Sequence, residues 1–451
     1  MTPTKLAWLV RPVDAAWLAA FRIGFGLTLA LSMARFLAYG WVDDFFVRPK
    51  LFFKYWGFEW VPALPSAGMH AVFWGLLVAA LCVAVGFLFR VTAPLLALGL
   101  VYVQLIDVST YLNHYYLAAL LALLLAVSPA YRCFSLDAWR KGRSQQTLPV
   151  AWLWLFRLQV GIVYVFAGLA KLQPDWLLHA QPLRIWLGAS TALPVIGPLL
   201  ALPGVPLLLS WCGFLFDTSV VGFLLWPKAR PYAYAVLLAF HALTRVLFPI
   251  GMFPLIMSLA ALVFFAPSWP RRALPKLGRA PVLLPPKAPN RWAKKALALG
   301  CAYAVLQLAL PLRYLAYDGN VLWHEQGMRF SWRVMVRAKG GGTTFVVYSP
   351  VRRHSYDVSP REYLTRLQEA EMSNQPDLIL QLAHHIHDDF QRRGYGDVQV
   401  RAESRVGLNG RRSAPFVDAH IDLSRVRDGL APARFVLPAP SEAPAHTRPV
   451  L

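Results

Sequence analysis

Apolar runs of about 20 residues recur along the chain as far as residue 314 and then stop. A run of that length crosses the hydrocarbon core of a bilayer, about 30 Å thick, as a helix. The chain is 57% hydrophobic and 15% charged, whereas soluble proteins average about 25% charged residues. Disordered, collagenous and disulfide-stapled classes are excluded, because the chain is too apolar and carries only four Cys. The sequence therefore predicts a polytopic membrane protein.

About nine of these runs are predicted to be transmembrane helices, because a helix satisfies its own backbone hydrogen bonds in lipid. They lie at residues 15–37, 68–89, 91–107, 114–130, 149–170, 205–226, 231–248, 251–267 and 293–314. The third, fourth and eighth are short, so re-entrant segments stay open there. The predicted fold is mainly α. Residues 1–315 form a membrane helical bundle, 316–430 a small α+β, β-sandwich-like domain, and 431–451 an irregular tail.

The C-terminal domain is predicted from a sharp change to polar composition after Asp318. Strands are expected at residues 343–348, 397–404 and 416–423, with turn chemistry at Asn409-Gly410. Helices are expected at residues 360–372 and 376–393.

Charge predicts the orientation. A net charge of +22 would suit nucleic-acid binding, but in a membrane protein Lys and Arg collect in cytoplasmic loops. If the N-terminus is cytoplasmic, the inner loops hold Lys5, Arg11, Arg90, Arg132, Arg140, Lys141, Arg143, Lys228, Arg230, Arg271, Arg272, Lys276, Arg279, Lys287, Arg291, Lys294 and Lys295. The outer loops hold fewer, namely Arg48, Lys50, Lys54, Lys171 and Arg184. An odd number of spans then places the C-terminal domain outside the cytoplasm, and no nucleic-acid partner is expected.

Ionisable groups in or beside membrane helices are expensive, so each is a functional candidate. Asp107 and His114 flank a predicted outer turn, and Lys171 lies where the fifth span ends. His241 and Arg245 are four residues apart and share a helix face. These residues are predicted to meet at one depth near the outer interface, with Asp107 and Arg245 as candidates for contacts to a cofactor.

Each candidate also has an ordinary structural interpretation. Lys171 is compatible with a side chain that snorkels to the interface, His114 with an interfacial anchor among tyrosines, and His241 with a satisfied core histidine. Arg22 and Arg157 are interpreted as helix-packing residues paired with a carbonyl or carboxylate.

Histidines near residue 385 invite a metal hypothesis, because His384 and His387 are three residues apart on a predicted helix. A structural metal site needs further ligands, and no third, separate ligand motif is present in the sequence. A solvated helix face is therefore expected there, and no metal is predicted.

Several stretches match a known family. They are Leu18-Ala-Ala-Phe-Arg-Ile-Gly-Phe-Gly26, Asp107, Asn113-His114, residues 163–176, Phe240-His241, residues 248–253 and residues 327–332. Residues 163–176 carry the long and specific pattern Tyr-x-x-Ala-Gly-x-x-Lys-Leu-x-x-Asp-Trp. On these residues the chain, over roughly 15–430, resembles the HTTM (horizontally transferred transmembrane) family, which includes the vitamin K-dependent γ-glutamyl carboxylases.

The resemblance implies a defined chemistry. In those carboxylases a lysine deprotonates vitamin K hydroquinone, oxygen adds, and a strongly basic oxygenated intermediate removes the γ-proton of a glutamate, which captures carbon dioxide. The quinone leaves as its 2,3-epoxide. By position in the pattern Lys171 matches the base. Asn113, His114 and His241 match residues that contact the quinone oxygens, and Tyr164 matches the lining of the same pocket.

The implied cofactor is reduced vitamin K or menaquinone, with O2 and CO2 as co-substrates. The expected partners are the bilayer, an isoprenoid quinone, a glutamate-containing protein substrate and a separate quinone-epoxide reductase, because no CxxC is present. No side chain is basic enough for a carbon acid beside a carboxylate, since Lys has a reference pKa of about 10.4. A hydroquinone hydroxyl is within reach of a neutral lysine, and burial favours the neutral form.

Two departures from the animal enzymes leave alternatives open. The chain ends near residue 451 where those enzymes continue into a larger lumenal region, and Ala170 stands where they have a second lysine. A hydroquinone epoxidase without peptide carboxylation is the first alternative. A non-catalytic quinone- or lipid-binding membrane protein is the second. The short form indicates a bacterial inner-membrane homologue with a cytoplasmic N-terminus.

Overall fold

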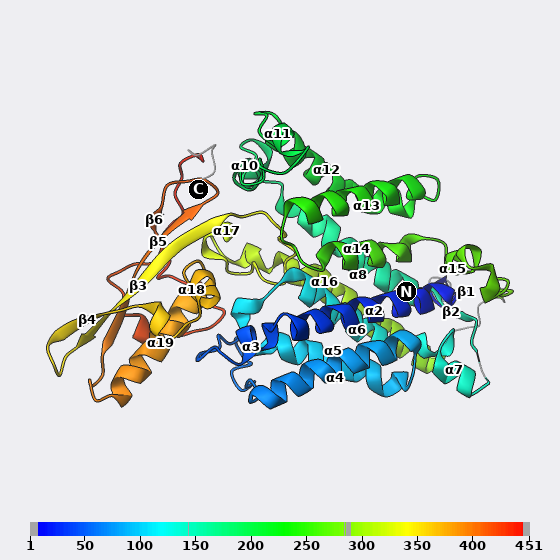
Figure 1. The fold of residues 1–451 in the computed structure, drawn as a ribbon, viewed down its shortest axis with the longest axis horizontal. Helices are drawn as coiled ribbons and strands as arrows, with labels where there is room; N and C mark the ends of the chain where they lie inside the picture. Colours follow the sequence, from blue (N-terminus) through cyan, green and yellow to red (C-terminus); the bar gives the residue numbers. More distant parts are fainter. Residues whose placement is uncertain (1–7, 143, 284, 286–289, 445–451) are drawn as a thin grey trace.

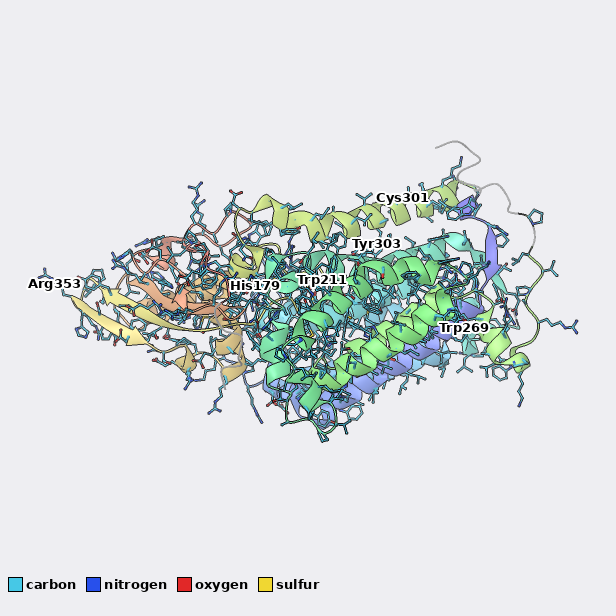
Figure 2. The ribbon with its side chains drawn as sticks, turned by 90° about the horizontal axis from the view of Figure 1, so that it is seen from above. His179, Trp211, Trp269, Cys301, Tyr303 and Arg353 are labelled. Carbon is cyan, nitrogen blue, oxygen red and sulfur yellow. The ribbon has the colours of Figure 1, made fainter. Side chains whose placement is uncertain are left out.

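The computed structural model describes residues 8–142, 144–283, 285 and 290–444. Long helices form a bundle, and an α+β domain lies at one end of it (Figure 1). In Figure 2, Arg353 marks the far end of that domain and Trp269 lies near the opposite end of the bundle. Lys5, Arg143 and Lys287, used above in the loop-charge argument, lie outside the described residues.

The bundle is built from helices of very different lengths. The longer ones are α2 (Ala16–Ala38), α4 (Ser66–Val85), α5 (Phe89–Ile106), α6 (Asn113–Val127), α8 (Val150–Ala170), α12 (Val205–Leu225), α13 (Arg230–Leu247), α14 (Phe253–Ala260) and α16 (Arg291–Ala309). Between them lie the short helices α3 (Trp41–Phe46), α7 (Leu136–Arg140), α9 (Pro174–Leu177), α10 (Leu183–Gly188), α11 (Gly197–Leu200) and α15 (Trp269–Ala273). A two-stranded ribbon, β1 (Pro12–Asp14) with β2 (Thr147–Pro149), closes the end away from the α+β domain.

Six helices of the described chain are long and apolar enough to cross a membrane: α2, α4, α5, α8, α12, and α16 with its 3-10 continuation η5 (Leu310–Ala316). Two more, α6 and α14 with η3 (Ala261–Phe264), are shorter apolar helices. Every predicted window coincides with a helix, and the mainly helical membrane fold is confirmed. Whether α6, α13 and α14 complete a set of nine crossings stays a prediction.

Helix α2 is the most enclosed of the candidate spans, and a glycine and an arginine dock it on α4. A Cβ on Gly26 would lie 2.8 Å from the carbonyl oxygen of Ala80, so the two backbones touch there. One turn earlier, Arg22 donates to the carbonyls of Val83 and Ala84 at 3.0 and 2.9 Å. The last carbonyls of a helix lack intrahelical donors. Arg22 therefore caps α4, which confirms its interpretation as a packing residue.

Arg157 has the same kind of role, because its guanidinium donates to the carbonyls of Val263, Phe264 and Phe265 at 2.9–3.2 Å. Helix α16 is attached far more lightly, with 11% of its apolar window buried against 72% for α2. The polar contacts of α16 with the bundle include the hydrogen bond from the hydroxyl of Tyr303, labelled in Figure 2, to Gln159 on α8, and one between Gln307 and Tyr116 of α6.

The C-terminal domain is one four-stranded antiparallel sheet with helices on one face. Its strand order is β4 (His354–Val358), β3 (Lys339–Ser349), β5 (Gln399–Leu408) and β6 (Ala414–Pro415). Side chains of β3 and β5 alternate between buried and exposed, as period-two strands require. Their buried side chains form a core with the helices α18 (Arg366–Met372) and α19 (Pro376–Arg392).

Three predictions for this domain need correction. The second sheet of a β-sandwich is not found in the described residues, because α18 and α19 occupy the inner face. Residues 416–423 form no strand beyond a single bridge from Val417 to Val436, and Asp422 caps a 3-10 turn instead. Residues 360–372 split into two short helices, because Thr365 starts a new capping box. The predicted turn is confirmed, since Asn409 and Gly410 have φ of 50° and 81°.

Charged and amide side chains join the C-terminal domain to the bundle. Both guanidinium nitrogens of Arg411 donate to the carboxylate of Asp175 at 2.7 Å, and the amide of Asn409 adds a third bond at 2.9 Å. At a second point, Gln368 of α18 donates to the carbonyl of Leu51 at 2.7 Å and to Asp107 at 2.8 Å. Gln381 of α19 adds two hydrogen bonds with the backbone of Lys54, so the domain is held beyond the ends of both α5 and α8.

We expect Arg411→Ala to lower the free energy of unfolding by about 3 kcal/mol, because it leaves a buried carboxylate without its cation. Thermal unfolding in detergent, followed by tryptophan fluorescence, measures the change. Arg412→Ala is the matched control, because Arg412 is exposed beside Arg411. Equal losses in the two variants would contradict the docking role.

Acid should weaken the same contact. Burial raises the pKa of Asp175, but the hydrogen bonds from Arg411 and Asn409 outweigh it and leave the pKa below its ordinary value. A carboxyl group whose pKa is lower in the folded state stabilises that state at pH values above its pKa in the unfolded chain, about 3.9. This stabilisation is lost as the pH falls through the lower pKa of the folded state. Wild-type protein should therefore lose more stability than Arg411→Ala when the pH is lowered from about 5 to 3, as compared in parallel unfolding curves.

Candidate functional site

An ion pair is buried between two helices at the end of the bundle that faces the C-terminal domain. Lys171 directly follows α8, and its Nζ donates to Oδ2 of Asp217 at 2.7 Å and to the carbonyl of Ala167 at 3.1 Å. The two charged side chains are only 7% and 8% exposed. Ionisable residues at such positions in membrane helices are rare and mark functional sites by default.

Asp217 was not among the site residues predicted from the sequence. It is the single acidic residue in the apolar helix α12, and the rule that selected Lys171 and His241 would have selected it as well. Its pairing with Lys171 is invisible in the sequence, because 46 positions separate the two residues.

Two glycines allow α8 and α12 to approach closely enough for this pair. A Cβ on Gly168 would lie 2.9 Å from the backbone nitrogen of Thr218, and one on Gly161 would lie 3.4 Å from Val221. The glycines are seven residues apart and so share one helix face. Small residues at such contacts are typical of membrane helices. Backbone contact at Gly168 therefore sets the distance that the ion pair spans.

Trp176, at the end of the recognised pattern, fixes α12 a second time. Its Nε1 donates to the carbonyl of Ser210 at 2.8 Å, and the Ser210 hydroxyl donates back to the carbonyl of Trp176. Nζ of Lys171 lies 5.1 Å from the centre of the Trp176 ring, within cation–π range. Ser210 and Asp217 are two turns apart on one face of α12. By binding Ser210, Trp176 therefore also fixes the position of the helix that carries Asp217.

A second polar pair lies on the neighbouring helices. The hydroxyl of Tyr164 on α8 is 2.9 Å from Nε2 of His241 on α13. Nδ1 of His241 is buried and has no hydrogen-bond partner among the described residues. A tyrosine hydroxyl bonded to one imidazole nitrogen fixes which nitrogen is left for a ligand.

Both polar pairs line one cavity of about 170 Å³, which we call the lysine cavity. Most of the rest of its wall is apolar and comes from α8, α10, α12, α13, α14 and the segment before α14, with Trp186, Leu187, Phe240, Leu247 and Met257 among the lining residues. The cavity is therefore an apolar chamber whose polar groups are a lysine–aspartate pair and a tyrosine–histidine pair.

Asn113 and His114 line a different and larger cavity of about 520 Å³, the histidine cavity. Its apolar wall is aromatic and comes from α2, α3 and α4, with Phe36, Phe45, Phe46 and Phe73. Asn113 accepts a hydrogen bond from the hydroxyl of Tyr111 at 3.0 Å. The predicted residues thus reach the same end of the bundle but fall into two chambers.

Phe253 stands between the chambers. Its ring centre is 6.4 Å from that of His114 and 6.2 Å from that of His241. Phe253 lines both cavities, as do Val334 and Met335 from the segment that leads into the C-terminal domain. The wall between the lysine cavity and the histidine cavity is therefore only a few side chains thick.

Asp107 and Arg245, the two candidates for cofactor contacts, lie outside both linings. Asp107 accepts from the backbone of Ser109 and from Gln368, so it holds the C-terminal domain. Arg245 is exposed, because α13 buries only Leu237, His241 and Leu247.

A polar hollow of about 710 Å³ adjoins both cavities from the side of the C-terminal domain. Arg337, Lys339 and Arg411 line it. The hollow shares Trp186 with the lysine cavity and Glu371 with the histidine cavity. The polar hollow therefore borders each apolar chamber at one shared side chain.

The cations of the polar hollow are held in place by acidic partners. Lys339 donates to Glu325 at 3.0 Å, and Arg337 pairs with the same carboxylate. Burial lowers the pKa of Lys339 to about 8. Arg411 is held by Asp175, as described above. These contacts fix the positions of three positive groups at the wall of the hollow.

The histidines that invited the metal hypothesis are occupied elsewhere. Nε2 of His384 lies 2.8 Å from the carbonyl of Val426, and His387 lies between Asp388 and Asp397 at 3.2 and 3.0 Å. Within the described ranges no group of three or more His, Cys, Asp or Glu side chains is arranged to hold a metal ion.

Comparison with known proteins places this architecture in a family. The HTTM domain family matches residues 10–269, and the lumenal domain of vitamin K-dependent γ-carboxylase matches residues 292–442. No solved structure matches the chain significantly. The first match covers the helices around both cavities, and the second covers the domain that lines the polar hollow. The chain belongs to the HTTM family and, within it, to the γ-carboxylase-like membrane proteins.

Proposed function

We propose that the protein is an integral membrane enzyme that oxidises a hydroquinone of the vitamin K or menaquinone type to its epoxide and carboxylates a glutamate-containing substrate. The observation that carries the proposal is the lysine cavity. It is an apolar chamber with a buried lysine at one wall and, at another, a histidine nitrogen that has no partner among the described residues.

These residues fit a flat aromatic ring with two hydroxyl groups. The apolar wall suits the ring, Lys171 Nζ suits one hydroxyl, and Nδ1 of His241 suits a second oxygen. When bound, the hydroquinone would supply the reducing power, since its oxidation by O2 drives removal of the glutamate γ-proton. Lys171 would accept a proton at Nζ, and Tyr164 would hold His241 in the tautomer that the ligand needs.

The aromatic histidine cavity extends the binding region away from the lysine. Phe36, Phe45 and Phe73 offer an apolar surface suited to an isoprenoid chain. Asn113 and His114 lie at the wall of that chamber and would reach the ligand past Phe253. With a ligand in place, these apolar side chains would limit the access of water, which would otherwise quench a strongly basic species.

The polar hollow supports a glutamate-containing substrate. Arg337, Lys339 and Arg411 place three positive groups at its wall, each paired with a carboxylate, and an acidic side chain that approaches from water would compete for these cations. Trp186 lines both this hollow and the lysine cavity. Ala170, the departure from the animal enzymes, packs in the core shared with the C-terminal domain and lies outside the lysine cavity's lining. The missing second lysine therefore leaves the chamber intact.

For the cellular setting we propose a bacterial inner membrane, with the N-terminus in the cytoplasm and the C-terminal domain outside. Arg132, Arg140 and Arg271 lie on short elements at the end of the bundle away from that domain, which supports this orientation. Recycling of the epoxide then falls to a separate reductase.

We expect Lys171→Ala to lower epoxide formation and CO2 incorporation at least 100-fold, because general bases contribute about 10²–10⁴ in rate. Purified protein is given reduced vitamin K or reduced menaquinone, bicarbonate and a glutamate-rich peptide, and both products are measured. Lys228→Ala, on an exposed loop, is the control.

Full epoxide formation by Lys171→Ala would show that another group is the base. Epoxide without incorporated CO2 in the wild type would assign the epoxidase alternative. A wild-type protein that binds quinone and forms neither product would be a binding protein.

We expect Tyr164→Phe to lower the epoxidation rate about tenfold, because it removes one hydrogen bond worth about 1 kcal/mol and frees the orientation of His241. The change is read as kcat at saturating quinone. Tyr232→Phe on the same pair of helices is the control, since Tyr232 is 75% exposed. Unchanged kcat in Tyr164→Phe would contradict the orienting role.

A further inference from the structure

We propose that Asp217 is the positioning residue of the lysine cavity and that it shares one proton with Lys171, so that the two side chains act as a single base. This inference rests on the proposed function for its substrate, a quinol. It adds Asp217 of α12 to the proposed site and identifies its carboxylate as the group that accepts a proton from Lys171.

The geometry joins the two groups directly. Nζ of Lys171 is 2.7 Å from Oδ2 of Asp217, a short, charge-assisted hydrogen bond. Nζ also donates to the carbonyl of Ala167 and lies over the Trp176 ring, but neither of these groups can take up a proton. Asp217 is therefore the group to which a proton on Nζ can move.

Both members of the pair face the chamber. Lys171 and Asp217 each belong to the lining of the lysine cavity, although both side chains are more than nine-tenths buried. A salt bridge that served only to fasten α8 to α12 would not need to reach the cavity wall. Buried pairs of that kind are often replaced by apolar residues without loss of stability.

Three contacts preorganise the pair. The close approach at Gly168 fixes the backbone of Asp217 against α8. Trp176 holds Ser210, two turns earlier on α12, and its ring lies under Nζ. A base that is held in place needs little rearrangement when a ligand arrives.

The other titratable groups around the chamber are few. Tyr164 comes from α8, His241 from α13 and Cys212 from α12. Tyr164 and His241 are hydrogen-bonded to each other, and Cys212 contributes a thiol to the wall. Lys171 and Asp217 are therefore the ion pair in the lining of the lysine cavity.

The proton balance follows from the pair's charge. At rest the couple is an ammonium and a carboxylate with zero net charge. An internal shift breaks an N–H bond of Lys171 and forms an O–H bond on Asp217, which leaves a neutral amine. The amine then takes the quinol hydroxyl proton, forming N–H as the quinol O–H breaks. The couple ends at +1 with Asp217 protonated, and the quinolate at −1 faces the Lys171 ammonium. No electrons are transferred in this step.

The test uses Asp217→Asn, which keeps the shape and a hydrogen-bond acceptor, and Asp217→Glu, which restores the carboxylate. We expect Asp217→Asn to lower the maximal epoxidation rate about 100-fold. The rising limb of its pH–rate profile should also move to lower pH, because loss of a neighbouring carboxylate favours the neutral amine. Asp217→Glu should restore the wild-type limb and much of the rate. Ser219→Ala, an exposed change on the same helix, should behave as wild type.

A second measurement does not need turnover. The intact protein in detergent is acetylated with acetic anhydride at a series of pH values, and mass spectrometry follows Lys171, with exposed Lys228 as the internal reference. The pH midpoint for Lys171 should fall in Asp217→Asn and return in Asp217→Glu. Equal midpoints in wild type and Asp217→Asn would overturn the shared proton.

The two experiments separate the hypotheses. A wild type that forms no epoxide but shows the midpoint shift would refute the proposed function and leave the lysine–aspartate couple standing. A wild type that forms epoxide while Asp217→Asn keeps its rate and pH limb would refute the couple alone. Loss of folding in Asp217→Asn would appear in the unfolding curve, and Asp217→Gln, which also lacks the carboxylate, then takes its place in both experiments.

Discussion

The contact between the backbones of α8 and α12 at Gly168 is the constraint on which the site depends. It brings a lysine at the end of one helix within 2.7 Å of an aspartate inside another. Neither charge would be tolerated alone in an apolar surrounding. Each charge therefore stabilises the other in the buried site, and together they provide the acid–base groups of the lysine cavity.

Residues of the pattern at positions 163–176 contact two neighbouring helices and the C-terminal domain. Tyr164 orients His241, Lys171 pairs with Asp217, and Trp176 holds α12. Asp175 then reaches out of the bundle to Arg411 of the C-terminal domain. A stretch of fourteen residues thus joins the chamber, its neighbouring helix and the domain above it, which explains why it is long and specific as a sequence signal.

Helix positions were predictable because apolar windows reflect the thickness of a bilayer, a property of each segment by itself. Lys171 and His241 were predictable for a similar local reason, since a charge in an apolar run stands out. Asp217 stands out by the same rule, but its pairing with Lys171 was not predictable, because it depends on the contact between α8 and α12. The partition by Phe253 and the outward direction of Arg245 depend on how α13 and α14 pack, which no single window records. The third predicted strand failed because its hydrophobic residues anchor a loop, not a sheet edge.

Helix α16 is attached only lightly to the bundle. It carries the chain from the bundle into the C-terminal domain, yet only 11% of its apolar window is buried, with Tyr303 bonded to α8 and Gln307 to α6. The family match for the lumenal domain begins at residue 292, so that it includes this helix. The C-terminal domain thus comes with a membrane anchor of its own. The apolar helix and the polar domain are thus one continuous stretch of chain that is joined to the rest of the bundle mainly at its C-terminal end, through Arg411 and Gln368.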